Sequence, residues 1–80
     1  MRRVVALLTS GETLIFEGGV AADGVLRRKR IEREADGHVN VYSDHVKPHA
    51  DGTEEVVATF WPARFPPEKL VKIQLEGDIS

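Results

Sequence analysis

The chain has 80 residues, no cysteine, 41% hydrophobic and 30% charged residues, and a formal net charge of −2. This length is typical of one small domain, so we treat residues 1–80 as a single domain. A chain this short buries only about 60% of the surface that its unfolded form exposes, which leaves little room for a deep active-site cavity. Without cysteine it has neither a disulfide framework nor a thiolate nucleophile, and we expect a cytoplasmic protein.

The first residues do not predict a segment for secretion or membrane insertion. Arg2 and Arg3 precede an apolar run, but that run ends at Leu8. A signal-peptide core needs about 7–15 apolar residues and a membrane-spanning helix about 20. We therefore expect no membrane as a partner.

Two apolar runs near the start of the chain predict a first hairpin. Residues 3–9 are almost continuously apolar, and residues 13–17 contain Leu14, Ile15 and Phe16. Continuous apolar runs are typical of strands that are buried on both faces, so we expect that of this hairpin. The glycines at 18 and 19 predict a break or bulge in its second strand.

A turn-forming tripeptide punctuates the rest of the chain. Ala-Asp-Gly occurs at 22–24, 35–37 and 50–52, and Ser10-Gly11 precedes these in a similar rhythm. Asp-Gly between β-prone runs is typical of hairpins, and we expect primed turns, in which glycine adopts a positive φ. The segments between the tripeptides share no pattern, so the repeat indicates turn chemistry and not an internal duplication.

Residues 25–34, which read VLRRKRIERE, admit two interpretations. Their types are good helix formers, and Asp23 and Gly37 are suitable helix caps. However, the apolar positions 25, 26 and 31 do not form a helical stripe, whereas Val25 and Ile31 share one face of a strand. We favour a long exposed strand, and the alternative is a helix over residues 25–35, which would make the fold α+β.

Three further strands follow. Residues 38–46 place Val39, Val41 and Ser43 on one face, and residues 54–61 form a more apolar run. Residues 71–76 alternate most regularly between apolar and polar side chains, which is the period of a strand. Pro62, Pro66 and Pro67 predict an irregular connection before that last strand, because proline removes ladder donors.

The segment Phe65-Pro66-Pro67-Glu68-Lys69-Leu70-Val71-Lys72-Ile73 resembles the end of SH3-like barrels, where Phe-Pro and a short 3₁₀ turn lead into the last strand. The chain lacks the acidic-aromatic opening and the tryptophan pair of peptide-binding SH3 domains, so the resemblance implies no binding residues. We expect an all-β fold of five or six antiparallel strands in meander order. An SH3-like barrel is favoured, with the last strand closing against the first.

A basic run is the most conspicuous chemical feature. Arg27, Arg28, Lys29, Arg30 and Arg33, with Glu32, carry a local charge of +4, which leaves −6 for the rest of the chain. Such a strand can bind an acidic protein, or follow a phosphate backbone while Tyr42 or Trp61 stacks on bases. It can also be a solvated edge strand that discourages aggregation. The acidic remainder favours an acidic protein over nucleic acid.

Other residue groups give no catalytic site. His38, His45 and His49 lie close in sequence, but Pro48 prevents a helical pair of the last two, and a strand points the first two to opposite faces. We expect a surface cluster that gains charge below about pH 6.5, and the question of a metal there stays open. No G-x-S-x-G motif or phosphate-binding glycine loop is present. We therefore expect no enzyme activity and no cofactor.

Residues 60–67 concentrate three of the five aromatic residues, three prolines and Arg64. Aromatic residues and arginine dominate interface hot spots, and a proline-stiffened segment loses little entropy on binding. A small barrel also needs rings in its core, so we expect Phe60 and Phe65 to be buried. By alternation Trp61 points the other way, and we expect it to be an exposed anchor.

We therefore predict a non-enzymatic small binding protein, an adaptor or inhibitor that acts through a protein–protein surface. Compact single-domain chains of this kind are common among phage-encoded and mobile-element accessory proteins, which is an analogy of class. The predicted partner-binding residues are Arg27, Arg28, Arg30, Arg33, Trp61 and Arg64. The alternatives are a nucleic-acid-binding small barrel that uses residues 27–33, and a structural or assembly subunit. We also expect a homodimer, because so short a chain leaves sheet edges uncovered.

Overall fold

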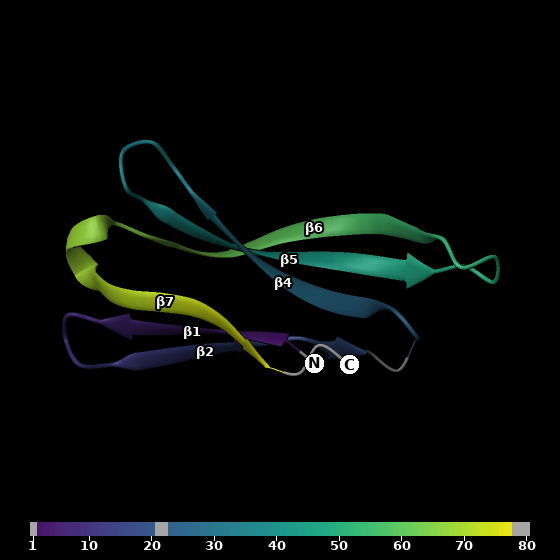
Figure 1. Cartoon of the computed structure of the whole chain (residues 1–80), viewed down its shortest axis with the longest axis horizontal. Helices are drawn as coiled ribbons and strands as arrows, with labels where there is room; N and C mark the ends of the chain where they lie inside the picture. The colour runs from purple at the N-terminus through teal and green to yellow at the C-terminus, as the bar shows by residue number, and fades with distance from the viewer. Residues whose placement is uncertain (1, 21–22, 78–80) are drawn as a thin grey trace.

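The computed structural model describes residues 2–20 and 23–77, and strands make up nearly all of its regular structure (Figure 1). The elements are β1 (Arg2–Leu8), β2 (Thr13–Glu17), β3 (Gly19–Val20), β4 (Leu26–Arg33), β5 (Val39–Pro48), β6 (Glu54–Phe65), the 3₁₀ turn η1 (Pro67–Lys69) and β7 (Leu70–Gly77). In these described ranges there is no helix long and apolar enough to cross a membrane.

The strands form two antiparallel sheets. One has the order β2-β1-β7 and the other the order β3-β4-β5-β6. β2 and β3 are separated only by Gly18, so the chain passes there from one sheet to the other. The last strand pairs with the first, for example through Ala6 and Ile73. This confirms the predicted all-β meander, although among the described strands β6 and β7 each keep a free edge and no closed barrel forms.

The ambiguous segment is a strand. β4 pairs with β5 without interruption from Leu26, opposite Val46, to Arg33, opposite Val39. The helix over residues 25–35 is therefore not adopted. A helix would place its three apolar residues on different sides, whereas the strand sets Ile31 against the buried Val41. The η1 turn before β7 is also where the resemblance to SH3-like barrels predicted it.

The hairpin turns follow one design, which differs from the prediction. In the β5–β6 turn His49 N–H donates to Thr53 O at 2.8 Å, and Gly52 N–H donates to His49 O at 3.1 Å. Residues 34–38 repeat the same pattern between β4 and β5. No described non-glycine residue has a positive φ, whereas Gly52 has 88°. These are three-residue loops with a glycine bulge, in which only the final loop residue, the glycine, has a positive φ. The expected primed turns are not formed, because they need a positive φ at the central positions of the turn, before this glycine.

One face of each sheet builds the core. The buried cluster comprises Val4, Ala6, Val39, Val41, Phe65 and Ile73, with contributions from both sheets. The expectation that the first hairpin is buried on both faces is wrong, since Val4 is fully buried but Ile15 is 51% exposed. The outer side of the three-stranded sheet has no second layer among the described residues, so only one face of this hairpin is covered.

Strand β6 is longer than predicted and continues through Pro62 to Phe65. Val41 pairs with Ala63 and Ser43 with Phe60, so two residues of β6, Trp61 and Pro62, oppose one residue of β5. Such a bulge on an edge strand tolerates a proline, because the missing N–H is not needed for the ladder.

Phe60 and Phe65 have different environments. Phe65 belongs to the core, as expected, but Phe60 is 54% exposed, so the prediction that it is buried is wrong. The β5–β6 hairpin extends beyond the three-stranded sheet in Figure 1, and that sheet therefore does not cover all of β6. Phe60 instead contacts the ring of His45, with centroids 4.6 Å apart.

Two glycine substitutions test the contact between the β4–β5 turn and η1. Gly37 and Gly52 have φ near +90° in equivalent turns, but a Cβ at Gly37 would lie 3.3 Å from Pro67, whereas one at Gly52 would meet nothing within 4 Å. We expect Gly52→Ala to cost about 1–2 kcal/mol of unfolding free energy from backbone strain alone. Gly37→Ala should cost at least about 0.5 kcal/mol more, measured by urea unfolding, because it adds a steric contact. Equal losses of unfolding free energy in the two variants would contradict the close contact between Gly37 and Pro67.

Candidate functional site

Polar and aromatic side chains gather on the face of the four-stranded sheet that points away from the core. Because Val39 and Val41 face the core, the alternate residues of β5 point outward. The register then places Arg28 opposite Asp44, Arg30 opposite Tyr42 and Glu32 opposite Asn40. We call this surface the outer face; it comprises Arg28, Arg30, Glu32, Asn40, Tyr42, Asp44, Thr59, Trp61 and Arg64.

Trp61 is exposed on the outer face but is held in a defined position. Trp61 is 56% exposed, and its Nε1–H donates a hydrogen bond to Asn40 Oδ1 at 3.1 Å. Its ring stacks on Tyr42, with centroids 6.0 Å apart and planes inclined by 21°. The expected exposure of Trp61 is thus confirmed, and its role in binding remains a prediction.

Arg30 and Asp44 form the central ion pair of the outer face. Arg30 Nε donates to Asp44 Oδ2 at 2.9 Å and its Nη2 to Oδ1 at 3.3 Å, and Arg30 also pairs with Glu32. The guanidinium lies 4.7 Å from the centroid of the Tyr42 ring. Thr59 Oγ1 donates a further bond to Asp44 at 2.9 Å. The bonds from Arg30 hold the pKa of Asp44 below its usual range and raise the pKa of Arg30.

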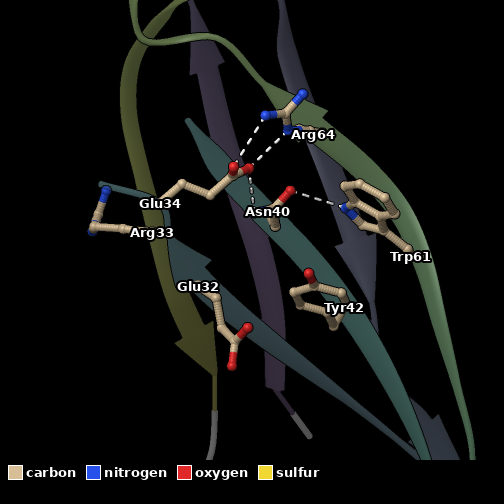
Figure 2. A pocket seen from close by; sticks show the side chains of 7 residues that line it. All are labelled: Glu32, Arg33, Glu34, Asn40, Tyr42, Trp61 and Arg64. Carbon is tan, nitrogen blue, oxygen red and sulfur yellow. Dashed lines mark hydrogen bonds and ion pairs between the residues drawn. The ribbon is translucent and has the colours of Figure 1, made fainter. Parts of the chain in front are cut away.

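A second network connects Trp61 to Arg64 (Figure 2). Asn40 accepts from Trp61 and donates through Nδ2 to Glu34 Oε2 at 2.9 Å. Arg64 donates to the same carboxylate through Nε at 2.7 Å and Nη2 at 3.0 Å. The two nitrogens form the bidentate geometry of a strong pair, and they lower the pKa of Glu34. Asn40 is only 4% exposed, so its amide fixes the position of both neighbours.

These side chains surround a hollow of about 280 Å³ that is open to solvent. It is lined by Glu32, Arg33, Glu34, Asn40, Tyr42, Trp61 and Arg64. Small-molecule sites usually bury most of their ligand in cavities of about 300–1,000 Å³. An open hollow of this size is better suited to one side chain of a protein partner.

The structure brings together four of the six predicted binding residues. Arg30, Arg33, Trp61 and Arg64 lie at or beside the hollow. Arg28 lies further along the outer face and pairs with Glu54 at 3.0 Å.

Two basic residues of β4 have other environments. Arg27 is on the opposite face, paired across the strands with His45. Lys29, also on that face, donates to Ser43 Oγ at 2.9 Å, and burial lowers its pKa.

Sequence reasoning missed Asn40, Glu34 and Asp44, which hold the outer face together. The alternation of residues 38–46 is the signal that Asn40, Tyr42 and Asp44 share one face, but it does not indicate that they bind Trp61 and Arg30. Glu34 gave no such signal because it lies just beyond β4 and reaches Arg64, which is thirty residues away in the sequence.

The three histidines have separate surroundings. His38 Nδ1 lies 2.9 Å from Asp36, His45 contacts Phe60, and His49 Nε2 lies 3.1 Å from Glu55. Within residues 2–20 and 23–77 no three side chains of histidine, cysteine, aspartate or glutamate are arranged to hold a metal ion.

Comparisons with known proteins give no match to a family model, to a curated protein or to a solved structure.

Asp44→Asn tests the central ion pair. The pKa of Asp44 lies below its usual value of 3.8, so the folded state binds fewer protons, and the stabilisation is present above about pH 4 and lost as the pH falls through the lowered pKa. We expect this substitution to reduce the free energy of unfolding at neutral pH by about 1–2 kcal/mol. It should also flatten the fall in Tm on acidification, measured by circular dichroism. The control Glu12→Gln, at an exposed carboxylate, should leave that fall unchanged.

Proposed function

We propose that the protein is a non-enzymatic binding protein, an adaptor or inhibitor of the cytoplasm, that contacts a protein partner through its outer face. The observation that carries this proposal is Trp61, a large aromatic residue that is more than half exposed and yet fixed by a hydrogen bond and a ring stack.

The chemistry of the outer face supports a protein partner. Tryptophan, tyrosine and arginine are the residues most enriched in interface hot spots, and Trp61, Tyr42 and Arg30 are neighbours here. Because Asn40 and Asp44 already hold these side chains, little rotamer entropy is lost when a partner binds. The hollow beside Trp61 offers a place for one partner side chain.

The ion pairs also bear on which partner fits. Arg28, Arg30 and Arg64 each already bind a carboxylate of this chain. A phosphate backbone would have to displace these carboxylates, which lowers the support for nucleic-acid binding by residues 27–33. A protein that buries Trp61 and leaves the internal pairs intact fits the outer face better.

Trp61→Ala tests this proposal, with Phe60→Ala as its control. The two aromatic residues are adjacent on β6, similarly exposed, and on opposite faces of the sheet. We expect a partner captured from the cell of origin to bind Trp61→Ala at least about tenfold more weakly, because a hot-spot aromatic is lost. Phe60→Ala should bind the partner with unchanged affinity, as measured by calorimetry with the purified partner.

Three results would contradict the proposal for the outer face: equal losses in both variants, a large fall in Tm for Trp61→Ala, or nucleic acid as the captured molecule. The fall in Tm would mean that Trp61 acts in stability and not in contact. Nucleic acid would also show a steep loss of binding with added salt.

A second candidate function, an assembly subunit that pairs with its own copy, is favoured by the shape of the molecule. Its radius of gyration is 14.0 Å, against about 12 Å for a compact domain of this length. Its accessible surface is 5346 Å², against about 4,800 Å² for a compact monomer of this mass. The edge strand β6 carries Val56, Val57, Phe60 and Trp61 at 48–59% exposure, and apolar edges of this kind invite pairing.

Light scattering after gel filtration tests this candidate. We expect a mass about twice 8.9 kDa at micromolar concentration, because edge pairing through β6 would cover the exposed valines. Val57→Lys should shift the mass toward the monomer, since it places a charge on that edge, whereas Val20→Lys on β3 should not. A monomer at every concentration would exclude the assembly function and leave the outer-face proposal standing.

A further inference from the structure

A second hollow lies between the β4–β5 turn, η1 and β7. Its volume is about 350 Å³, and it is lined by Arg33, Gly37, Val39, Pro67, Leu70, Val71, Lys72 and Ile73. Gly37 approaches Pro67 so closely that an added Cβ would lie 3.3 Å from the proline ring. The turn and η1 therefore bound the hollow at that end.

This hollow follows the free edge of β7. Four consecutive residues, 70–73, line it, although side chains of a strand alternate between its two faces. Along an edge the backbone of every residue is reached, whereas over one face the side chains of every second residue dominate the lining. The other edge of β7 is occupied by β1, so the lined edge is the one that has no partner among the described strands. Its backbone groups are available to a further strand.

The side chains of the hollow combine an apolar floor with positive charge. Val39 and Ile73 are 3% and 8% exposed and belong to the core, while Val71 is 60% exposed. Arg33 and Lys72 form no ion pair with any residue that the structure describes, unlike Arg28, Arg30 and Arg64. The two cations are therefore available to the carboxylates of a partner.

We propose that an acidic, extended segment of a partner protein adds to the free edge of β7 as a further strand. Its backbone would pair with residues 70–73, its apolar side chains would cover Val39 and Ile73, and its carboxylates would bind Arg33 and Lys72. Strand addition of this kind takes affinity from main-chain hydrogen bonds and specificity from alternate side chains. Ile73 and Lys72 point to opposite faces of β7, so a segment that alternates apolar and acidic residues fits.

This inference rests on the proposed protein-binding function and adds to it the chemical class and conformation of a partner segment. Arg33 lines both hollows, but Trp61 does not line this one. A nucleic acid offers phosphates to Arg33 and Lys72 but no N–H and C=O groups in strand register for the edge of β7. An acidic peptide strand satisfies both requirements.

The experiment is a titration of the ¹⁵N-labelled full chain with blocked peptides of about eight residues, a usual strand length. The probes alternate Glu and Val, Gln and Val, or Lys and Val. We expect saturable amide shifts that cluster at residues 33, 37–39 and 70–73 with the Glu-Val peptide. The Gln-Val peptide should bind more weakly, the Lys-Val peptide should not bind, and added salt should weaken the Glu-Val complex.

Matched variants separate the two cations of the hollow from the net charge. Arg33→Gln with Lys72→Gln should weaken the Glu-Val complex about tenfold, the loss of two exposed ion pairs. Arg27→Gln with Lys47→Gln removes the same charge elsewhere and should change the affinity for the Glu-Val peptide less than about twofold. Trp61→Ala should leave the peptide affinity unchanged, so this inference and the outer-face proposal fail separately.

Several outcomes would overturn the inference. They are no saturable shift, shifts centred on the outer face, equal binding of the Lys-Val peptide, or equal losses in both double variants. Tighter binding of a short oligothymidine at the same amides would assign the hollow to nucleic acid instead. If the Arg33/Lys72 variant does not fold, the comparison of the three peptides on the unaltered chain still tests whether the hollow binds an acidic strand.

Discussion

The packing of two small sheets through one face each is the constraint on which the rest of this structure depends. The chain supplies a buried cluster of six residues, from Val4 to Ile73, and this cluster is enough to join the sheets at one end. It does not cover the outer face of the four-stranded sheet or the far part of the β5–β6 hairpin (Figure 1). Those regions must be held by interactions other than burial, or by a partner.

Polar side chains order the uncovered face. Asn40 joins Trp61 to Glu34, and Asp44 joins Arg30 to Thr59 across three strands. Exposed ion pairs each contribute little to stability, so a face built from them stays ordered chiefly because several are linked. The consequence is a surface whose aromatic side chains are fixed without being buried, which is the state that lowers the entropy cost of binding.

The sequence predicted the architecture because its signals were local. Glycines after aspartate marked the turns, and the lack of a helical stripe at positions 25, 26 and 31 identified β4 as a strand. The turn type was wrong because Asp-Gly is compatible with two loops: a two-residue primed loop, in which the aspartate also needs a positive φ, and a three-residue loop, in which only the glycine has one. Phe60 was misassigned since burial depends on how far the second sheet extends. That extent is set by tertiary packing, and alternation along β6 carries no information about it.

The proposed binding surface was harder to predict for a related reason. Residues 27–33 read as a block of positive charge, yet in a strand their side chains point to two faces and meet different partners. Arg28 and Arg30 find carboxylates on β5 and β6, whereas Arg33, at the end of the strand, finds none among the described residues. The cations that are free to bind a carboxylate of another molecule are therefore those left without one after folding. Pairing across strands determines which cations these are, and a count of charges along the sequence cannot show this pairing.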